Sequence, residues 1–143
     1  MAVVASFLLA ACMSAAPPPP APHVVARSLV FNTTLKKFVA VAESGKRDSR
    51  LDWTTDGCSV PVLGSTGRTF DFYDACRRHD FAYRNLGRLD GGKWWTAQMR
   101  ARVDSVFKKD MLSDCAARSA STRPSCNAWA ETYYRAVRIY AGP

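Results

Sequence analysis

Residues 70–85, FDFYDACRRHDFAYRN, carry the pattern that decides the fold of this chain. Small and apolar side chains recur there at spacings of three and four, which predicts an amphipathic helix that ends near Leu86. The predicted inner face comprises Phe72, Ala75, Cys76, His79, Ala82, Tyr83 and Leu86. His79 therefore lies on the buried side, and Asp80 is rotated from it by about 100° around the helix. One turn thus brings together a buried base and a carboxylate that could bind a metal ion.

The same spacing rule predicts three further helices. Their predicted ranges are 32–43, 94–112 and 125–140. Asn32 or Thr33 is the expected N-cap of the first of them, and Gly45 is expected to end it. No run of residues in the sequence convincingly predicts a strand. The sequence therefore predicts an all-α fold, a small disulfide-stapled helical bundle with an antiparallel pair formed by the His79 helix and helix 94–112.

Asp104 interrupts the apolar face of the predicted helix 94–112. The other residues on that face are Ala97, Ala101, Phe107 and Met111. Carboxylates are rarely buried without a partner, and the common explanation is a salt bridge to a neighbour such as Arg100 or Lys108. The position of Asp104 on an inner face favours a different partner. If the two helices run antiparallel, Asp104 can meet His79 and hold one of its ring nitrogens.

The cysteine pattern predicts two disulfide bonds. The chain has five cysteines, and Cys12 falls in the apolar N-terminal stretch, which leaves Cys58, Cys76, Cys115 and Cys126. Their spacing lacks the CxxC pairs that are typical of zinc sites. Three pairings are possible, and we favour Cys58 with Cys76 and Cys115 with Cys126. The first bond would join the Asp56 loop to the His79 helix.

The N-terminal residues predict an exported protein. Residues 1–16 are apolar and end in small residues, as in a signal peptide, although no Lys or Arg lies near Met1. Residues 17–27 are expected to be a proline-rich linker or propeptide, and residues 28–143 a folded domain. An alternative is a lipoprotein signal that ends at Cys12. We favour secretion to the outside of the cell.

Two short motifs leave alternatives open. Lys46-Arg47 is a possible dibasic processing site, but cleavage there would remove the predicted helix 32–43, so we favour an exposed turn. Asn32-Thr33-Thr34 is a glycosylation sequon, for which helix capping is the simpler explanation.

The charge of the chain indicates an anionic partner. The formal net charge is +8, and Arg27 is the only charged residue among the first 30. Nucleic acid and an anionic membrane surface would both suit such a charge. The basic residues follow no zinc finger, RNA-binding signature or heptad pattern, so we expect no nucleic-acid partner.

A candidate metal site lies in the loop before the His79 helix. Asp56 and Asp80 could supply carboxylate oxygens, and Gly57 a backbone carbonyl, to a hard cation such as Ca²⁺. A single inward histidine is more often a core residue than a catalyst. Asp80 beside His79, together with Asp104 and Asp56, favours a catalytic site instead.

Four segments of the chain resemble the secreted phospholipases A2 of the bacterial and fungal type. They are LDWTTDGC at 51–58, ACRRHDFAYRN at 75–85, RVDSVF at 102–107 and YYRAV at 133–137. The resemblance extends from about Phe31 to Tyr140. It implies an all-α enzyme that uses Ca²⁺ to hydrolyse the sn-2 ester of glycerophospholipids, which releases a fatty acid and a lysophospholipid.

The resemblance also implies a role for each candidate residue. His79 matches the general base and Asp104 the carboxylate that orients it. Asp80 and Asp56 match the carboxylate ligands of Ca²⁺, and Gly57 the position that lends a backbone oxygen. The sequence contains no G-x-S-x-G motif, so a serine nucleophile is not expected.

The implied partner is the surface of a phospholipid bilayer or micelle, expected to be anionic, and we expect the protein to be a monomer. Candidates for membrane contact are Arg88, Leu89, Lys93, Trp94 and Trp95, although core packing explains the tryptophans at least as well. The alternative is a catalytically silent secreted binding or toxin-like module on the same scaffold. Loss of His79, Asp80 or Asp104 would have favoured it, and all three are present.

Overall fold

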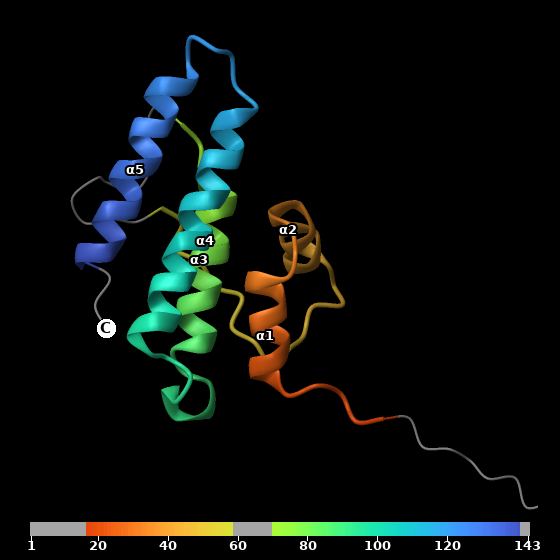
Figure 1. Cartoon of the computed structure of the whole chain (residues 1–143). Coiled ribbons are helices and arrows are strands. Elements are labelled where there is room, and N and C mark those ends of the chain that lie inside the picture. The colour runs from red at the N-terminus through yellow and green to blue at the C-terminus, as the bar shows by residue number, and fades with distance from the viewer. Residues whose placement is uncertain (1–16, 59–69, 141–143) are drawn as a thin grey trace, which may run out of the picture.

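A computed structural model describes residues 17–58 and 70–140 of the chain (Figure 1). The predicted signal peptide and all of residues 59–69 lie outside the described residues. The described elements are α1 (Pro22–Phe31), α2 (Leu35–Glu43), α3 (Tyr73–Leu86), the 3-10 turn η1 (Leu89–Gly92), α4 (Ala97–Ala116) and α5 (Arg123–Tyr140). These residues include no strand, and the predicted all-α fold is confirmed.

Helix α1 corrects the predicted boundary of the folded region. The sequence predicted a linker over 17–27 and order from Ser28, but α1 begins at Pro22. A proline at the first helical position loses no hydrogen bond, because the first amide groups of a helix have no partner within it. The helix then buries Ala26, Leu29 and Val30. The proline tract therefore leads directly into a packed helix.

The turn between α1 and α2 also differs from the prediction. The N-cap of α2 is Thr34, whose side chain accepts a hydrogen bond of 3.2 Å from the Lys37 amide. Asn32 instead caps the C-terminus of α1, and the Thr33 hydroxyl donates to the Leu29 carbonyl at 2.7 Å. The wrong prediction arose because a helix was not expected immediately before this turn.

Helices α3, α4 and α5 run alternately down, up and down, and α4 lies against both α3 and α5 (Figure 1). Helix α4 begins at Ala97, later than the predicted start at Trp94, because Thr96 caps it by accepting from the Met99 amide at 3.0 Å. Helix α3 ends at Leu86 as predicted. The antiparallel α3 and α4 are the pair that carries His79 and Asp104.

Two disulfides and two apolar clusters hold the helices together. Cys58 is bonded to Cys76, and Cys115 to Cys126, which are the pairs favoured from the sequence. One cluster surrounds the disulfides between α3, α4 and α5, and the other joins α1 and α2 to the second half of α3. No helix in the described part of the chain is long and apolar enough to cross a bilayer.

Candidate active site

His79 and Asp104 form a direct contact across the α3–α4 interface. The Nε2 atom of His79 lies 2.8 Å from Oδ1 of Asp104, which is completely buried. An ionised carboxylate can only accept hydrogen bonds, so Nε2 carries the proton in this contact. In a neutral imidazole the other nitrogen, Nδ1, is then unprotonated and can accept a proton.

Two further hydrogen-bond donors and one more arginine surround Asp104. The Tyr83 hydroxyl donates to Oδ1 at 2.8 Å, and Arg138 Nη1 donates to Oδ2 at 2.7 Å. Arg100 Nε lies 3.9 Å from Oδ2. Burial alone would raise the pKa of Asp104, but the hydrogen bonds from His79, Arg138 and Tyr83 outweigh it and hold that pKa below its usual range. Asp104 is therefore a buried carboxylate that stays charged.

The partners of Asp104 correct the simple salt-bridge interpretation of this residue. Of the two neighbours considered, Arg100 stands at the edge of ion-pair distance, whereas Lys108 Nζ contacts Glu131 of α5 at 2.6 Å. The shortest contacts of Asp104 instead go to α3 and α5.

Aromatic rings fix the plane of the His79 imidazole. The ring centroids of Tyr83 and Phe107 lie 4.4 Å and 4.6 Å from that of His79. Tyr83 is held in turn by Trp95, whose ring centroid is 4.6 Å away. Burial raises the pKa of Tyr83 well above its usual value, so its hydroxyl remains a donor to Asp104. Nε2 of His79 is thus hydrogen-bonded to Asp104, and the imidazole contacts the rings of Tyr83 and Phe107.

The loop that carries Asp56 is attached to the face of α3 next to His79. The Thr55 hydroxyl donates to Asp80 Oδ2 at 2.6 Å, and the Asp56 amide donates to the same oxygen at 3.2 Å. Arg84 Nη2 donates to Asp56 Oδ1 at 3.0 Å. The Cys58–Cys76 bond anchors the end of this loop to the same helix. The structure therefore brings Asp56 and Asp80 together, as the sequence predicted.

A buried asparagine holds the beginning of this loop. Asn85 Nδ2 donates to the carbonyls of Asp52 and Phe81, both at 2.8 Å, and its Oδ1 accepts from the Asp52 amide at 2.9 Å. Since Asn85 is 2% exposed, these bonds are shielded from water. They fix the loop before it reaches the candidate metal ligands.

The electrostatics of the two carboxylates suit a cation. Burial, together with the neighbouring Asp56 carboxyl, raises the pKa of Asp80 to about 6. Two carboxylates that repel each other in a half-buried site are stabilised by a hard divalent ion, for which carboxylate oxygens are the preferred ligands. The described residues include no group of three or more His, Cys, Asp or Glu side chains that could hold a metal. A cation here would therefore also need backbone oxygen, for which Gly57 is the candidate, and water.

The histidine and the two carboxylates open into one pocket of about 290 Å³. It is lined by Asp56, Gly57, Cys58, Cys76, His79, Asp80, Tyr83, Arg84, Arg88, Phe107 and Val137. Gly57 has a φ of +71°, a left-handed conformation that residues with a Cβ rarely adopt. The pocket combines a base, two acidic groups, two arginines and an apolar wall.

Most candidates for membrane contact have packing roles in the structure. Leu89 and Trp95 are partly buried against the α1–α2–α3 cluster. Trp94 stacks on His23 with ring centroids 4.6 Å apart, and its Nε1 donates to Asp90 at 2.6 Å. Core and surface packing therefore explain these three side chains, as the simpler interpretation of the tryptophans held.

Sequence reasoning missed Arg138 as a partner of Asp104, and it considered Arg100 only as a salt-bridge partner of Asp104 within the same helix. Arg138 lies in the last turn of α5 and Arg100 in the first turn of α4, and neither position differs in sequence from an exposed helical arginine. Tyr83 was predicted on the inner face of α3, four residues after His79, and this spacing could have indicated a shared partner.

Fold and site together define a class: a small disulfide-linked helical protein in which a His–Asp pair and two adjacent carboxylates share one pocket. The chain belongs to the prokaryotic phospholipase A2 family, whose model matches residues 26–141.

Two curated relatives agree with this assignment. A protein named secretory phospholipase A2 from Beauveria bassiana is 37% identical over 113 residues, which is 79% of this chain. Another of the same name from Arthroderma benhamiae is 33% identical over 113 residues, or 77% of this chain. The chain spans about half the length of the first relative (55%) and 72% of the second.

Proposed function

We propose that this protein is a secreted, calcium-dependent phospholipase A2 that hydrolyses the sn-2 ester of glycerophospholipids to a fatty acid and a lysophospholipid. The observation that carries the proposal is the 2.8 Å contact between His79 and the buried Asp104, at a pocket that also contains Asp56 and Asp80. Membership of the family and the names of the two relatives support the same reaction.

His79 acts as the general base in the proposed reaction. Its Nδ1 accepts a proton from a water molecule, which attacks the sn-2 carbonyl carbon, and the same proton then passes to the leaving glycerol oxygen. Asp104 accepts from Nε2, holds the ring in the tautomer that leaves Nδ1 free, and stabilises the imidazolium that forms. Water is the nucleophile, so no acyl-enzyme forms.

Asp56, Asp80 and the Gly57 carbonyl would hold Ca²⁺ in this site. When bound, the ion supplies positive charge to the substrate phosphate and to the oxygen that becomes negative during attack. The protein's own contribution is to hold two carboxylates beside the base, through the Thr55–Asp80 hydrogen bond and the Cys58–Cys76 bond.

A phospholipid surface is the proposed partner, and an anionic one suits the charge of +8. Arg84 and Arg88 line the pocket and place part of this charge beside it. We propose that the protein acts as a monomer. Disulfide bonds and the secretory names of the relatives support export.

We further propose that any leader is removed before α1. Helix α1 buries Ala26, Leu29 and Val30, and cleavage after Arg47 would remove both α1 and α2 from the core. Arg50 Nη2 also donates to the Pro20 carbonyl at 3.0 Å, which ties the end of the proline tract to the folded domain.

The proposal is tested by measuring fatty-acid release from phosphatidylcholine vesicles with Ca²⁺ and with a chelator. We expect release with Ca²⁺ and none with the chelator. Asp80→Asn should abolish both Ca²⁺ binding by calorimetry and release, because the metal loses a charged ligand. Asp74→Asn is the matched control on the same helix, since Asp74 does not line this pocket.

Two results would contradict the proposal. Undiminished release in chelator would exclude the calcium mechanism. No release from any vesicle with Ca²⁺, by folded protein, would favour the catalytically silent module.

A further inference from the structure

We propose that Arg138 is a positioning residue for the hydrolysis. It fixes the Asp104 carboxylate from the side opposite His79, so that the last turn of α5 controls the orientation of the base. This inference rests on the function proposed above for His79 and Asp104. That function names a base and an orienting carboxylate on α3 and α4 only, and the inference adds a role for α5.

The two oxygens of Asp104 are bound from different elements. Oδ1 accepts from His79 and Tyr83, which both come from α3, whereas Oδ2 accepts from Arg138 on α5. A carboxylate held through one oxygen only can turn about its Cβ–Cγ bond. With donors on both oxygens, such a rotation breaks at least one charge-assisted hydrogen bond. Arg138 therefore fixes the plane of the Asp104 carboxylate, and this plane sets the direction of the hydrogen bond to His79.

The unequal burial of the pair makes this bond important. The Arg138 side chain is 36% exposed, but Asp104 is 0% exposed. An ordinary surface ion pair of an arginine contributes little, because water replaces the lost partner. Here water cannot reach Asp104 freely, so loss of Arg138 leaves a buried, charged oxygen without its shortest donor.

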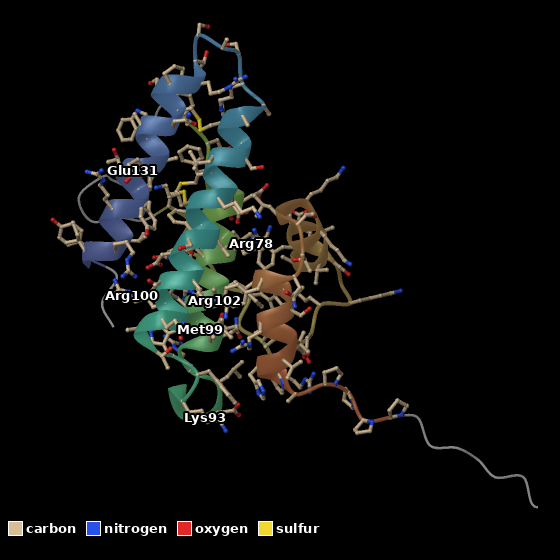
Figure 2. The ribbon with its side chains drawn as sticks, viewed as in Figure 1. Arg78, Lys93, Met99, Arg100, Arg102 and Glu131 are labelled. Carbon is tan, nitrogen blue, oxygen red and sulfur yellow. A yellow bond between two sulfur atoms is a disulfide. The ribbon has the colours of Figure 1, made fainter. Side chains whose placement is uncertain are left out.

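A second arginine fixes the backbone from which Arg138 extends. Arg100 of α4 donates through Nη2 to the carbonyls of Val137 and Arg138, at 3.1 Å and 2.9 Å, and lies beside the last turn of α5 (Figure 2). Its Nε also donates to the Tyr83 hydroxyl at 3.2 Å. Arg100 of α4 thus binds the end of α5, and Arg138 of α5 binds Asp104 of α4. Both arginines contact Asp104 or its partner Tyr83.

The end of α5 is also part of the pocket. Val137, the residue before Arg138, lines the same pocket as His79 and Asp80. The last turn of α5 therefore supplies a wall for the substrate and a donor for the positioning carboxylate at once.

Kinetics of Arg138→Gln test the proposal. We expect kcat to fall roughly 10-fold with KM nearly unchanged, the size expected for losing one hydrogen bond to a buried charge. Arg138→Lys keeps the charge and should retain most of the rate. The matched control is Arg135→Gln on the same helix, because Arg135 is 73% exposed and pairs with Glu131. It should leave kcat unchanged.

A double-mutant cycle with Asp104→Asn separates positioning from a general effect on the fold. If Arg138 acts through the Asp104 carboxylate, Arg138→Gln should lower kcat in the wild-type background and have little further effect in the Asp104→Asn background. An equal loss in both backgrounds would overturn the proposal, as would an Arg138→Gln enzyme with wild-type kcat.

Two further results keep the test decisive. If Arg138→Gln does not unfold cooperatively, the cycle is measured with Arg138→Met, which keeps a long side chain but has no donor for Asp104, and additive losses again contradict positioning. If the wild-type protein shows no calcium-dependent hydrolysis, the proposed function fails. If the wild-type protein is active and Arg138→Gln has the same kcat, only the inference about Arg138 is refuted.

Discussion

Asp104 is the residue on which the chemistry of this site depends. It has no exposed surface, yet its pKa is held low by donors from α3 and α5. A buried charge of this kind is strongly destabilising without partners, so the network around it and the position of His79 are formed together. The proposed base is thus held by a carboxylate that is itself held on both oxygens.

Two substitutions should separate the base from the carboxylate that orients it. His79→Gln removes the proton acceptor and should lower kcat by about 10²- to 10⁴-fold. Asp104→Asn keeps the base but weakens the stabilisation of the imidazolium, so the loss should be smaller, with KM little changed. Initial rates on phosphatidylcholine vesicles measure both. If Asp104→Asn lowers the stability of the protein but leaves kcat unchanged, Asp104 is a structural carboxylate and does not orient the base.

The stability conferred by Asp104 should depend on pH in a defined direction. Its folded pKa lies below the usual value, so its stabilisation is present above the unfolded pKa and is lost as the pH falls through the folded one. Asp104→Asn should therefore cost about 2 kcal/mol near neutral pH, and less at pH values below roughly 3. Urea unfolding of both proteins at the two pH values measures this difference. A difference that grows on acidification would contradict the charged-carboxylate assignment.

The two disulfides have different roles in positioning the site. The Cys58–Cys76 bond ends the loop that carries Asp56 and Gly57, whereas Cys115–Cys126 joins α4 to α5 away from the pocket lining. The first bond therefore positions the loop of the candidate metal site, and the second holds α4 and α5 together.

Removing each bond by a pair of serine substitutions should have different consequences. Loss of either bond should lower the free energy of unfolding by about 2–4 kcal/mol, because the unfolded chain gains freedom. Loss of Cys58–Cys76 should in addition weaken Ca²⁺ affinity, measured by calorimetry on folded protein. Loss of Cys115–Cys126 should leave that affinity near the wild-type value. Equal effects on Ca²⁺ affinity would show that the first disulfide does not order the loop.

The helical elements were predictable where apolar spacing dominates, and less so where capping or tertiary contacts decide. The end of α3 at Leu86 followed from periodicity, because its inner face is buried. Helix α1 was missed since a proline tract precedes it, and no local rule shows that its apolar side packs on α3. The start of α4 was placed too early, because Trp94 fits a helical pattern but Thr96 provides the cap.

At the level of the whole molecule, three antiparallel helices bring together residues that the sequence keeps far apart. The contact of His79 with Asp104 could be anticipated, because both interrupt apolar faces of adjacent helices. The contact of Arg138 with Asp104 could not, since it depends on how α5 lies against α4. A charged residue in a terminal turn carries no sign of a buried partner. The sequence thus predicted the contact between His79 of α3 and Asp104 of α4, and it missed the contact that Arg138 of α5 makes with Asp104.

The position of the cleaved ester is the property that distinguishes the proposed reaction from any other lipid hydrolysis. Vesicles of phosphatidylcholine with different acyl chains at sn-1 and sn-2 should be incubated with the protein in Ca²⁺ and in chelator, and the released fatty acids identified by mass spectrometry. We expect only the sn-2 chain, only with Ca²⁺, and with an equal amount of lysophospholipid. Release of the sn-1 chain, or equal release in chelator, would contradict a calcium-dependent phospholipase A2 built on His79 and Asp104.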